Sequence, residues 1–125
     1  LPGTGQGAGD PNFNLPGPQI LSDTMGVDFD PYLLRVYLAV RRNWYSVIPE
    51  IARLGKRGRV VLQFHILRNG AVQQLMLEDA SGTPSMDAAA ISSIRLSDPF
   101  PPLPAEFKGE QIRLQFTFSY NMTQR

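Results

Sequence analysis

The chain has 125 residues, of which 42% are hydrophobic and 18% are charged, which is enough apolar material for one small core. A net charge of +1 argues against general nucleic-acid binding, so no nucleic-acid partner is expected. Cysteine is absent, which excludes disulfide scaffolds, zinc–thiolate sites, iron–sulfur clusters and cysteine nucleophiles. The only histidine, His65, leaves little for a metal site, and we expect neither a metal nor a cofactor.

Glycine and proline are concentrated at the N-terminus, where residues 1–18 hold five Gly and four Pro. This composition predicts a Pro/Gly-rich linker over residues 1–26, followed by a folded domain over residues 27–125. The segment 20–27 is open to two interpretations, because Ile20 and Leu21 suit either a short extra strand or the linker.

No stretch of the sequence reaches the ~18 uncharged apolar residues that a membrane-spanning helix needs. The most apolar stretch, 32–48, is interrupted by Arg35, Arg41 and Arg42. The chain begins with Leu1 and lacks the basic and then apolar pattern of a signal peptide. We therefore expect a fragment or a processed chain, with any membrane anchor upstream of Leu1.

The first helix is predicted over residues 31–48. Asp30 suits the N-cap, and Pro31 suits the first helical position, where a missing N–H is harmless. Pro49 limits the helix because it disfavours helical geometry at Ile48. Apolar residues recur between these limits at spacings of three and four, which predicts one buried stripe. The stripe consists of Leu33, Val36, Tyr37, Val40, Trp44 and Val47.

A hairpin is predicted next. Apolar residues alternate with others over residues 59–68, as in a strand with one buried face. Asn69-Gly70 is a strong hairpin signal and predicts a type I′ turn, in which both residues have positive φ. The returning strand is predicted over residues 71–79. Its apolar parity breaks near Gln73–Gln74, which indicates a β-bulge.

A second helix and a proline-rich crossing follow the hairpin. Thr83 suits the N-cap and Pro84 the first helical position. The crossing over residues 98–104 is stiffened by proline and is expected to bury Phe100 and Leu103. The buried stripe of the second helix is predicted to be Met86, Ala89, Ala90 and Ile94.

The last element is the most regular predicted strand, because apolar and polar residues alternate over residues 111–120. The order helix, strand, strand, helix, strand predicts an α+β domain, with two helices packed on one face of a three-stranded antiparallel sheet. The final strand joins an edge of the hairpin. An open sheet has free edges, and these can recruit another strand.

Residues for catalysis are not gathered in any recognisable pattern. Glu78 and Asp79 are adjacent in a strand, so their side chains point to opposite faces and make a poor acid–base pair. The basic block over residues 31–68 has eight bases and one acid, and it is interpreted as a solvated face rather than a patch for an acidic partner. We expect a binding or mechanical module and not an enzyme.

Several features in order carry a family resemblance. They are Gly58 before an alternating strand, the Asn69-Gly70 hairpin, Ser81-Gly82 before the second helix, the proline crossing around Phe100, and the last aromatic strand. Together they span roughly half of the chain. This pattern resembles the C-terminal domain of TonB-family energy transducers, and TolA-like domains have a related helix-and-sheet architecture.

The resemblance implies a periplasmic domain, anchored in the inner membrane by a segment upstream of Leu1. Such a domain would couple the inner-membrane proton-motive force, through an ExbB/ExbD-like motor, to transport by an outer-membrane TonB-dependent receptor. It would bind the receptor's extended box peptide by strand addition. We expect the last strand to be the open edge for this peptide. The residues expected to line the strand are Gln111, Arg113, Gln115, Thr117 and Ser119.

One segment departs from the family pattern. TonB carries Gln-Pro-x-Tyr-Pro just before its domain, in a segment implicated in receptor contact, whereas Tyr45-Ser46-Val47-Ile48-Pro49 stands here. Only Pro49 matches, so receptor recognition through the pre-domain segment at Ile48 and Pro49 is in doubt. The alternatives are a TolA-like domain, a secretion-related envelope module that self-associates as a homodimer through the same strand, and a small enzyme with an unrecognised site.

Overall fold

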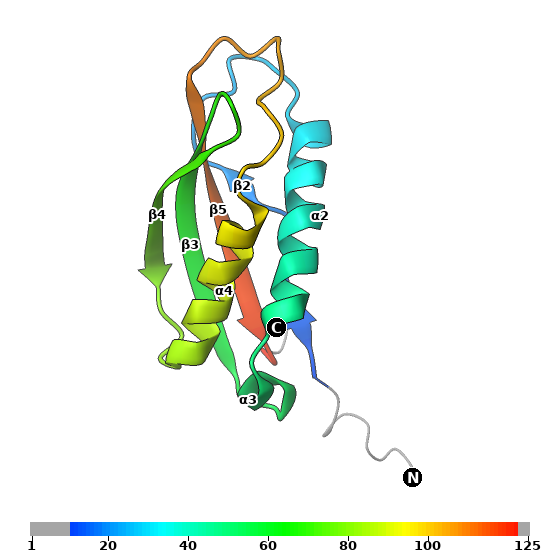
Figure 1. Cartoon of the computed structure of the whole chain (residues 1–125), viewed down its shortest axis with the longest axis vertical. Coiled ribbons are helices and arrows are strands. Elements are labelled where there is room, and N and C mark those ends of the chain that lie inside the picture. The colour runs from blue at the N-terminus through cyan, green and yellow to red at the C-terminus, as the bar shows by residue number, and fades with distance from the viewer. Residues whose placement is uncertain (1–10, 123–125) are drawn as a thin grey trace.

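Three long antiparallel strands form the centre of the fold in the computed structural model, which describes residues 11–122. The middle strand, β3 (Gly58–Leu67), pairs on one side with β4 (Val72–Asp79) and on the other with β5 (Gln111–Tyr120) (Figure 1). The pairing of β3 with β5 is in register over all ten residues of each strand. The predicted strands and their order are therefore confirmed.

Two further strands lie outside the predicted three. β1 (Phe13–Asn14) and β2 (Gln19–Ile20) both pair antiparallel with the outer side of β5. The sheet therefore has five strands, with β1 and β2 beside β5, then β3, then β4. Residues 11–26, assigned to the linker by composition, instead lie along the fold, and the ambiguous segment at Ile20 contributes to a strand. Residues 1–10 of the predicted linker lie outside the described residues.

Two long helices, α2 (Asp30–Val47) and α4 (Pro84–Ser97), lie side by side on one face of the sheet, as predicted (Figure 1). Phe29, rather than Asp30, is the N-cap of α2, and the Asp30 N–H at the start of the helix donates to the Asp28 carboxylate at 3.0 Å. Thr83 is the N-cap of α4, again without a side-chain hydrogen bond. A short helix that was not predicted, α3 (Glu50–Arg53), follows the extended backbone at Pro49.

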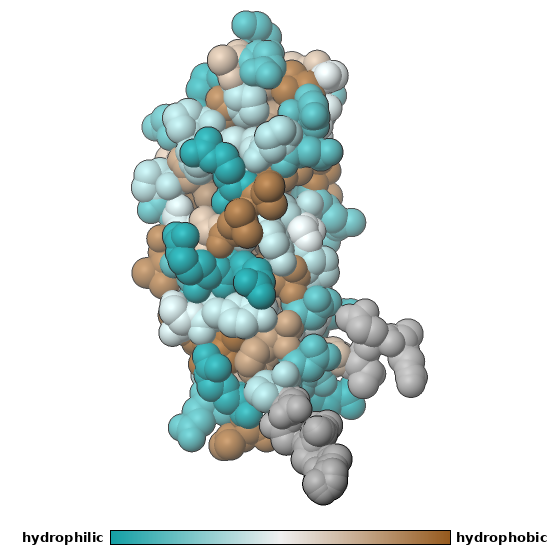
Figure 2. Space-filling view, turned by 90° about the vertical axis from the view of Figure 1, so that its right-hand side faces the viewer, coloured by the Kyte–Doolittle hydropathy of each residue, from teal (hydrophilic) through white to brown (hydrophobic). Residues whose placement is uncertain are grey.

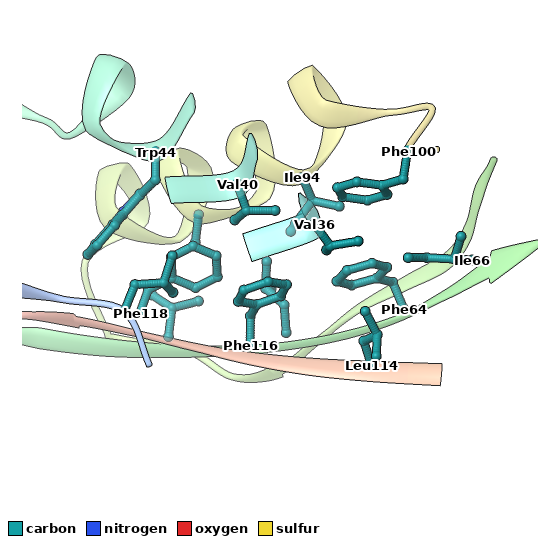
Figure 3. Close-up of a cluster of buried hydrophobic side chains, with 14 of the residues drawn as sticks. Val36, Val40, Trp44, Phe64, Ile66, Ile94, Phe100, Leu114, Phe116 and Phe118 are labelled. Atoms are coloured by element: carbon teal, nitrogen blue, oxygen red, sulfur yellow. The ribbon is translucent and has the colours of Figure 1, made fainter. Parts of the chain in front are cut away.

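The core lies between the two long helices and the inner face of the sheet. Trp44, Val40 and Val36 of α2 face the phenylalanines of β3 and β5 in Figure 3. All four predicted stripe residues of α4 are buried, as are Phe100 and Leu103 of the crossing. In the first helix, Tyr32 is buried together with Val36, Val40 and Trp44, whereas Leu33 and Tyr37 are only partly buried.

The hairpin between β3 and β4 closes differently from the predicted type I′ turn. Gly70 has φ +92°, but Asn69 does not have positive φ. The Gly70 N–H donates to the Leu67 carbonyl at 2.8 Å, and the Asn69 side chain accepts from the Ala71 N–H at 3.0 Å. This local side-chain bond stabilises a turn with a single left-handed residue. The crossing packs on the turn, because the Phe100 N–H donates to the Gly70 carbonyl at 2.9 Å.

The predicted β-bulge in the second strand of the hairpin is confirmed. Gln63 pairs with Met76, but His65 pairs with Gln73, so β4 has one extra residue at this point. Gln74 takes up the irregularity with φ +56°. A second register shift lies between Val61 and Leu62. Both shifts bend β4 away from a regular ladder.

Candidate functional site

Strand β5 separates two kinds of residue by parity. Its even-numbered residues from Ile112 to Tyr120 are all fully buried against the helices. The odd-numbered residues lie on the opposite, polar face and are exposed or half-buried. These are the five residues that the sequence predicted for peptide binding: Gln111, Arg113, Gln115, Thr117 and Ser119.

The backbone of the odd-numbered residues faces the outer edge of β5. The Arg113 carbonyl accepts from the Leu21 N–H at 2.7 Å, and the Arg113 N–H donates to the Ser22 hydroxyl at 3.0 Å. In an antiparallel strand, the N–H and C=O of one residue point to the same side, and the side alternates along the strand. Gln115, Thr117 and Ser119 therefore also direct their backbone groups outward, where an added strand would pair.

This outer edge is occupied by the chain's own N-terminal segment, which we name the N-terminal strap (residues 12–22). Phe13 is the partner of Tyr120, and Gln19 is the partner of Gln115. The Asn12 carbonyl also accepts from the Asn121 N–H at 2.6 Å. The expectation that the last strand is an open edge therefore does not hold along its whole length.

The strap leaves a gap at its middle. β1 ends at Asn14 and β2 begins at Gln19, so the loop 15–18 crosses the part of β5 around Thr117 without a strand pair. A hollow of about 370 Å³ lies here, lined by Pro16, Gly17, Gln19, Gln115 and Thr117. Since Pro16 and Pro18 lack an N–H, each removes a donor that a ladder would need.

The first part of the strap is anchored in the core. The Phe13 ring packs edge-on against the rings of Trp44, Tyr45 and Tyr120 at centroid distances of 6.2–6.3 Å. Leu15 is only 5% exposed and belongs to the hydrophobic core. The residues of the strap were missed because its two strands are too short to show a period, although the Phe13-Asn14-Leu15 alternation is a weak signal.

The second part of the strap is held mainly by polar contacts. The Gln115 side-chain amide donates to Gln19 at 2.9 Å, and the Gln63 amide donates to Gln115 at 2.8 Å. These bonds form a row of glutamines across β3, β5 and β2. Gln19 is exposed, Leu21 is 36% exposed and Ile20 is partly buried against the core, so no side chain of this part is as buried as Leu15.

A partly apolar surface on α2 lies beside the strap. Leu34 and Leu38 are one helical turn apart and are 56% and 52% exposed. A hollow of about 290 Å³ joins this region to the strap, since its lining includes Gly17, Pro18 and Leu34. Figure 2, which looks onto the α2 side, shows brown side chains interrupted by teal ones on this face. Peptide side chains that leave the edge of β5 on this side would meet an apolar surface.

The pre-domain segment at Ile48 and Pro49 lies inside the fold. Ile48 is the C-cap of α2 and is 6% exposed, and Pro49 is the N-cap of α3. Because α2 precedes these residues and packs on the sheet, they connect two elements of one domain. Ile48 is therefore not available to contact a partner in this arrangement.

Metal-ligating side chains are not brought together within residues 11–122. No cluster of three His, Asp or Glu residues occurs among them. His65 Nδ1 lies 3.1 Å from the Gln111 side-chain oxygen, at hydrogen-bond distance on the polar face of the sheet. No helix in this part of the chain is long and apolar enough to cross a bilayer.

Burial perturbs two tyrosines of the core. Desolvation raises the pKa of Tyr120 to about 12, although the hydrogen bond from Trp44 opposes the shift. The Tyr120 hydroxyl accepts from Trp44 Nε1 and donates to the Met86 carbonyl, both at 2.9 Å. Desolvation likewise raises the pKa of Tyr32 to about 12, and its hydroxyl donates to the Pro101 carbonyl at 2.7 Å. Both hydroxyls hold the fold together and face no open site.

Comparison with known proteins places these features in context. The model of the family described as Gram-negative bacterial TonB protein C-terminal matches residues 49–122, which is more than half of the chain and runs from α3 to the end of β5. The fold is similar to the NMR solution structure of the Helicobacter pylori TonB C-terminal domain, with a TM-score of 0.60 and 22% identity over 80% of this chain and 88% of that one. A search of curated proteins finds no match. The strap and α2 precede the part of the chain that the family model covers.

Proposed function

Because the chain belongs to the family of TonB C-terminal domains, we propose that it captures the extended box peptide of an outer-membrane TonB-dependent receptor by strand addition. The site is the outer edge of β5. The observation that carries this proposal is that the edge already accepts extended chain, from Phe13–Asn14 and from Gln19–Ile20. The backbone groups that receive a strand are those of Arg113, Gln115 and Thr117.

Strand addition suits a domain that transmits force. Backbone hydrogen bonds supply affinity with little demand on the peptide sequence, and several of them share a load applied along the strand. β5 is also firmly tied to the rest of the domain, since its whole length pairs with β3 and its inner face is core. A pull on an added strand would therefore reach the core directly.

The energy would come from elsewhere in the assembly. We place this periplasmic domain downstream of an inner-membrane anchor, with an ExbB/ExbD-like motor supplying work from the proton-motive force. The proposed role needs no catalytic group and no cofactor in this domain.

The burial of Ile48 favours an alternative partner for the same strand. The segment aligned with the receptor-contacting box of TonB matches it only at Pro49, and Ile48 within it is buried, which favours a partner of the TolA or secretion type. A homodimer paired through the same edge belongs to this alternative. Both versions use β5, and they differ in the strand that it receives.

The test is an NMR titration with synthetic peptides that carry the extended N-terminal segments of outer-membrane receptors from the same bacterium. Amide shifts should concentrate in residues 111–120. Gln115→Pro should abolish binding while the helices stay folded, because the N–H it removes faces the outer edge and not β3. Gln115→Ala, which keeps that N–H, is the matched control. Normal peptide binding by Gln115→Pro would sink the proposal.

A further inference from the structure

We propose that residues 19–22, the releasable arm of the strap, are a built-in competitor that occupies the peptide-binding edge of β5 and is displaced when a peptide binds. This inference rests on the proposed function of that edge. It adds a regulatory element that lies outside the part of the chain matched by the family model.

Competition follows from the atoms that the arm uses. The Arg113 carbonyl accepts from the Leu21 N–H, and the Arg113 N–H donates to Ser22. Gln115 is paired with Gln19 through the ladder and through the side chains. An added strand needs these same outward N–H and C=O groups, and each N–H has one proton to donate. The arm and a peptide therefore cannot occupy this part of the edge together.

The arm is the weakly held half of the strap. None of its side chains is buried: Gln19 is exposed, Leu21 is 36% exposed, and Ile20 is only partly buried against the core. The other half is held by Phe13, which packs on an aromatic cluster, and by the buried Leu15. Local opening favours segments with few buried apolar contacts, so the arm should open while Phe13 and Leu15 stay in place.

Both ends of the arm allow it to swing without unfolding a helix. On one side lies the loop 15–18 with Gly17, which contacts β5 through no strand pair. On the other side is a tight turn, in which Met25 and Gly26 have φ +53° and +79° and the Val27 N–H donates to the Thr24 carbonyl at 3.0 Å. Val27 then packs on the core before α2 begins, so this turn marks where the movement stops.

Hydrogen exchange in the free chain tests whether the arm opens. The N–H groups of Arg113 and Gln115 point to the outer edge and are hydrogen-bonded by the arm. Those of Leu114 and Phe116 point the other way, toward β3. We expect the first pair to exchange at least roughly tenfold faster than the second, through opening of the arm alone. Equal protection of all four amides would overturn the proposal.

A disulfide lock tests the competition. Gln19 and Gln115 are ladder partners, and the Cα atoms of such a pair lie about 5.5 Å apart, within the range that a disulfide accepts. The chain has no cysteine, so Gln19→Cys with Gln115→Cys creates a unique crosslink. Oxidation should weaken binding of the receptor peptide by roughly tenfold or more, and reduction should restore it. The two single-cysteine variants, treated alike, are the controls.

Opening the arm should have the opposite effect. Gln19→Pro removes the N–H that faces Gln115, and it should lower the Kd for the receptor peptide by roughly threefold or more. Gln19→Ala keeps that N–H and should change the Kd less. An unchanged Kd for the receptor peptide in Gln19→Pro would contradict the proposal that the arm competes for this edge.

A second probe separates this proposal from the proposed function. It is a synthetic peptide with the sequence of residues 12–22, offered to Gln19→Pro and to the locked chain. If the 12–22 peptide binds only to Gln19→Pro and no receptor peptide binds to either chain, the result would support a competing arm. It would also overturn the proposal that a receptor peptide is the partner. Binding of receptor peptides to the locked chain with unchanged Kd would support the partner and overturn the competitor.

Discussion

The two edges of the sheet meet solvent in different ways. The outer edge of β5 belongs to a strand in full register with β3, and it is covered by the strap. The edge of β4 has no strand partner among residues 11–122, but it is interrupted by two register shifts and ends at Glu78 and Asp79. Bulges and charges are features that protect an exposed edge from unwanted pairing. The bulges and charges of β4 thus disfavour pairing with another chain, whereas the regular edge of β5 is protected only by the strap that covers it.

The difference indicates which edge is suited to binding. A regular strand offers evenly spaced donors and acceptors to an incoming chain, and a bulged strand does not. β4 is also exposed on both faces over much of its length, with Met76 and Leu77 at 49% and 42% exposure. A strand so weakly tied to the core would be a poor point for transmitting force.

The largest expected effect comes from breaking the inner face of β5. Phe116 is fully buried and stacks near Phe64 at a centroid distance of 6.1 Å. Phe116→Ala should lower the free energy of unfolding by about 3–5 kcal/mol, from lost burial and the cavity left behind. On β4, Leu77→Ala should change it by less than about 0.5 kcal/mol, since that side chain is already half in water. Urea denaturation measures both, and equal losses would contradict the contrast between the strands.

Alkaline pH should weaken the end of β5 that carries Tyr120. Burial raises the pKa values of Tyr120 and Tyr32 from 10.0 to about 12 in the folded chain. Between these values the folded state holds more protons than the unfolded state, so the free energy of unfolding should fall as the pH rises from 10 to 12. Tyr120→Phe should make this fall shallower. An equally steep fall in that variant, measured by denaturation at several pH values, would rule out Tyr120 as its source.

The smallest expected effect lies at the bulge of β4. Gln74 has φ +56°, a region that favours glycine. Gln74→Gly should raise the free energy of unfolding by up to about 1 kcal/mol, and Gln74→Val should lower it by about 1 kcal/mol, because a branched side chain tolerates this geometry least.

Deletion of Gln74 should straighten the edge and cause concentration-dependent association in sedimentation velocity. A deletion variant that stays monomeric would show that the bulge does not protect β4.

The long elements could be predicted from the sequence because their signals are local. The alternation over residues 59–68 and 111–120, and the helical spacing that includes Val36, Val40 and Trp44, reflect which side of each element meets the core. The polar set on β5 followed from the same parity. Its role as an outward-facing edge depended on which strand became its neighbour, and periodicity carries no such information.

The sequence by itself determined the two helices, the three long strands, their order and the parity that divides β5 into a buried and a polar face. Only the tertiary structure decided that residues 11–26 join the fold, that Asn69 avoids positive φ, and that Ile48 is buried between two helices. Gln19 and Gln115 pair across 96 positions of sequence. Strands of two residues have no period of their own and form only where a finished edge leaves backbone groups unpaired, so their location is a property of the folded sheet.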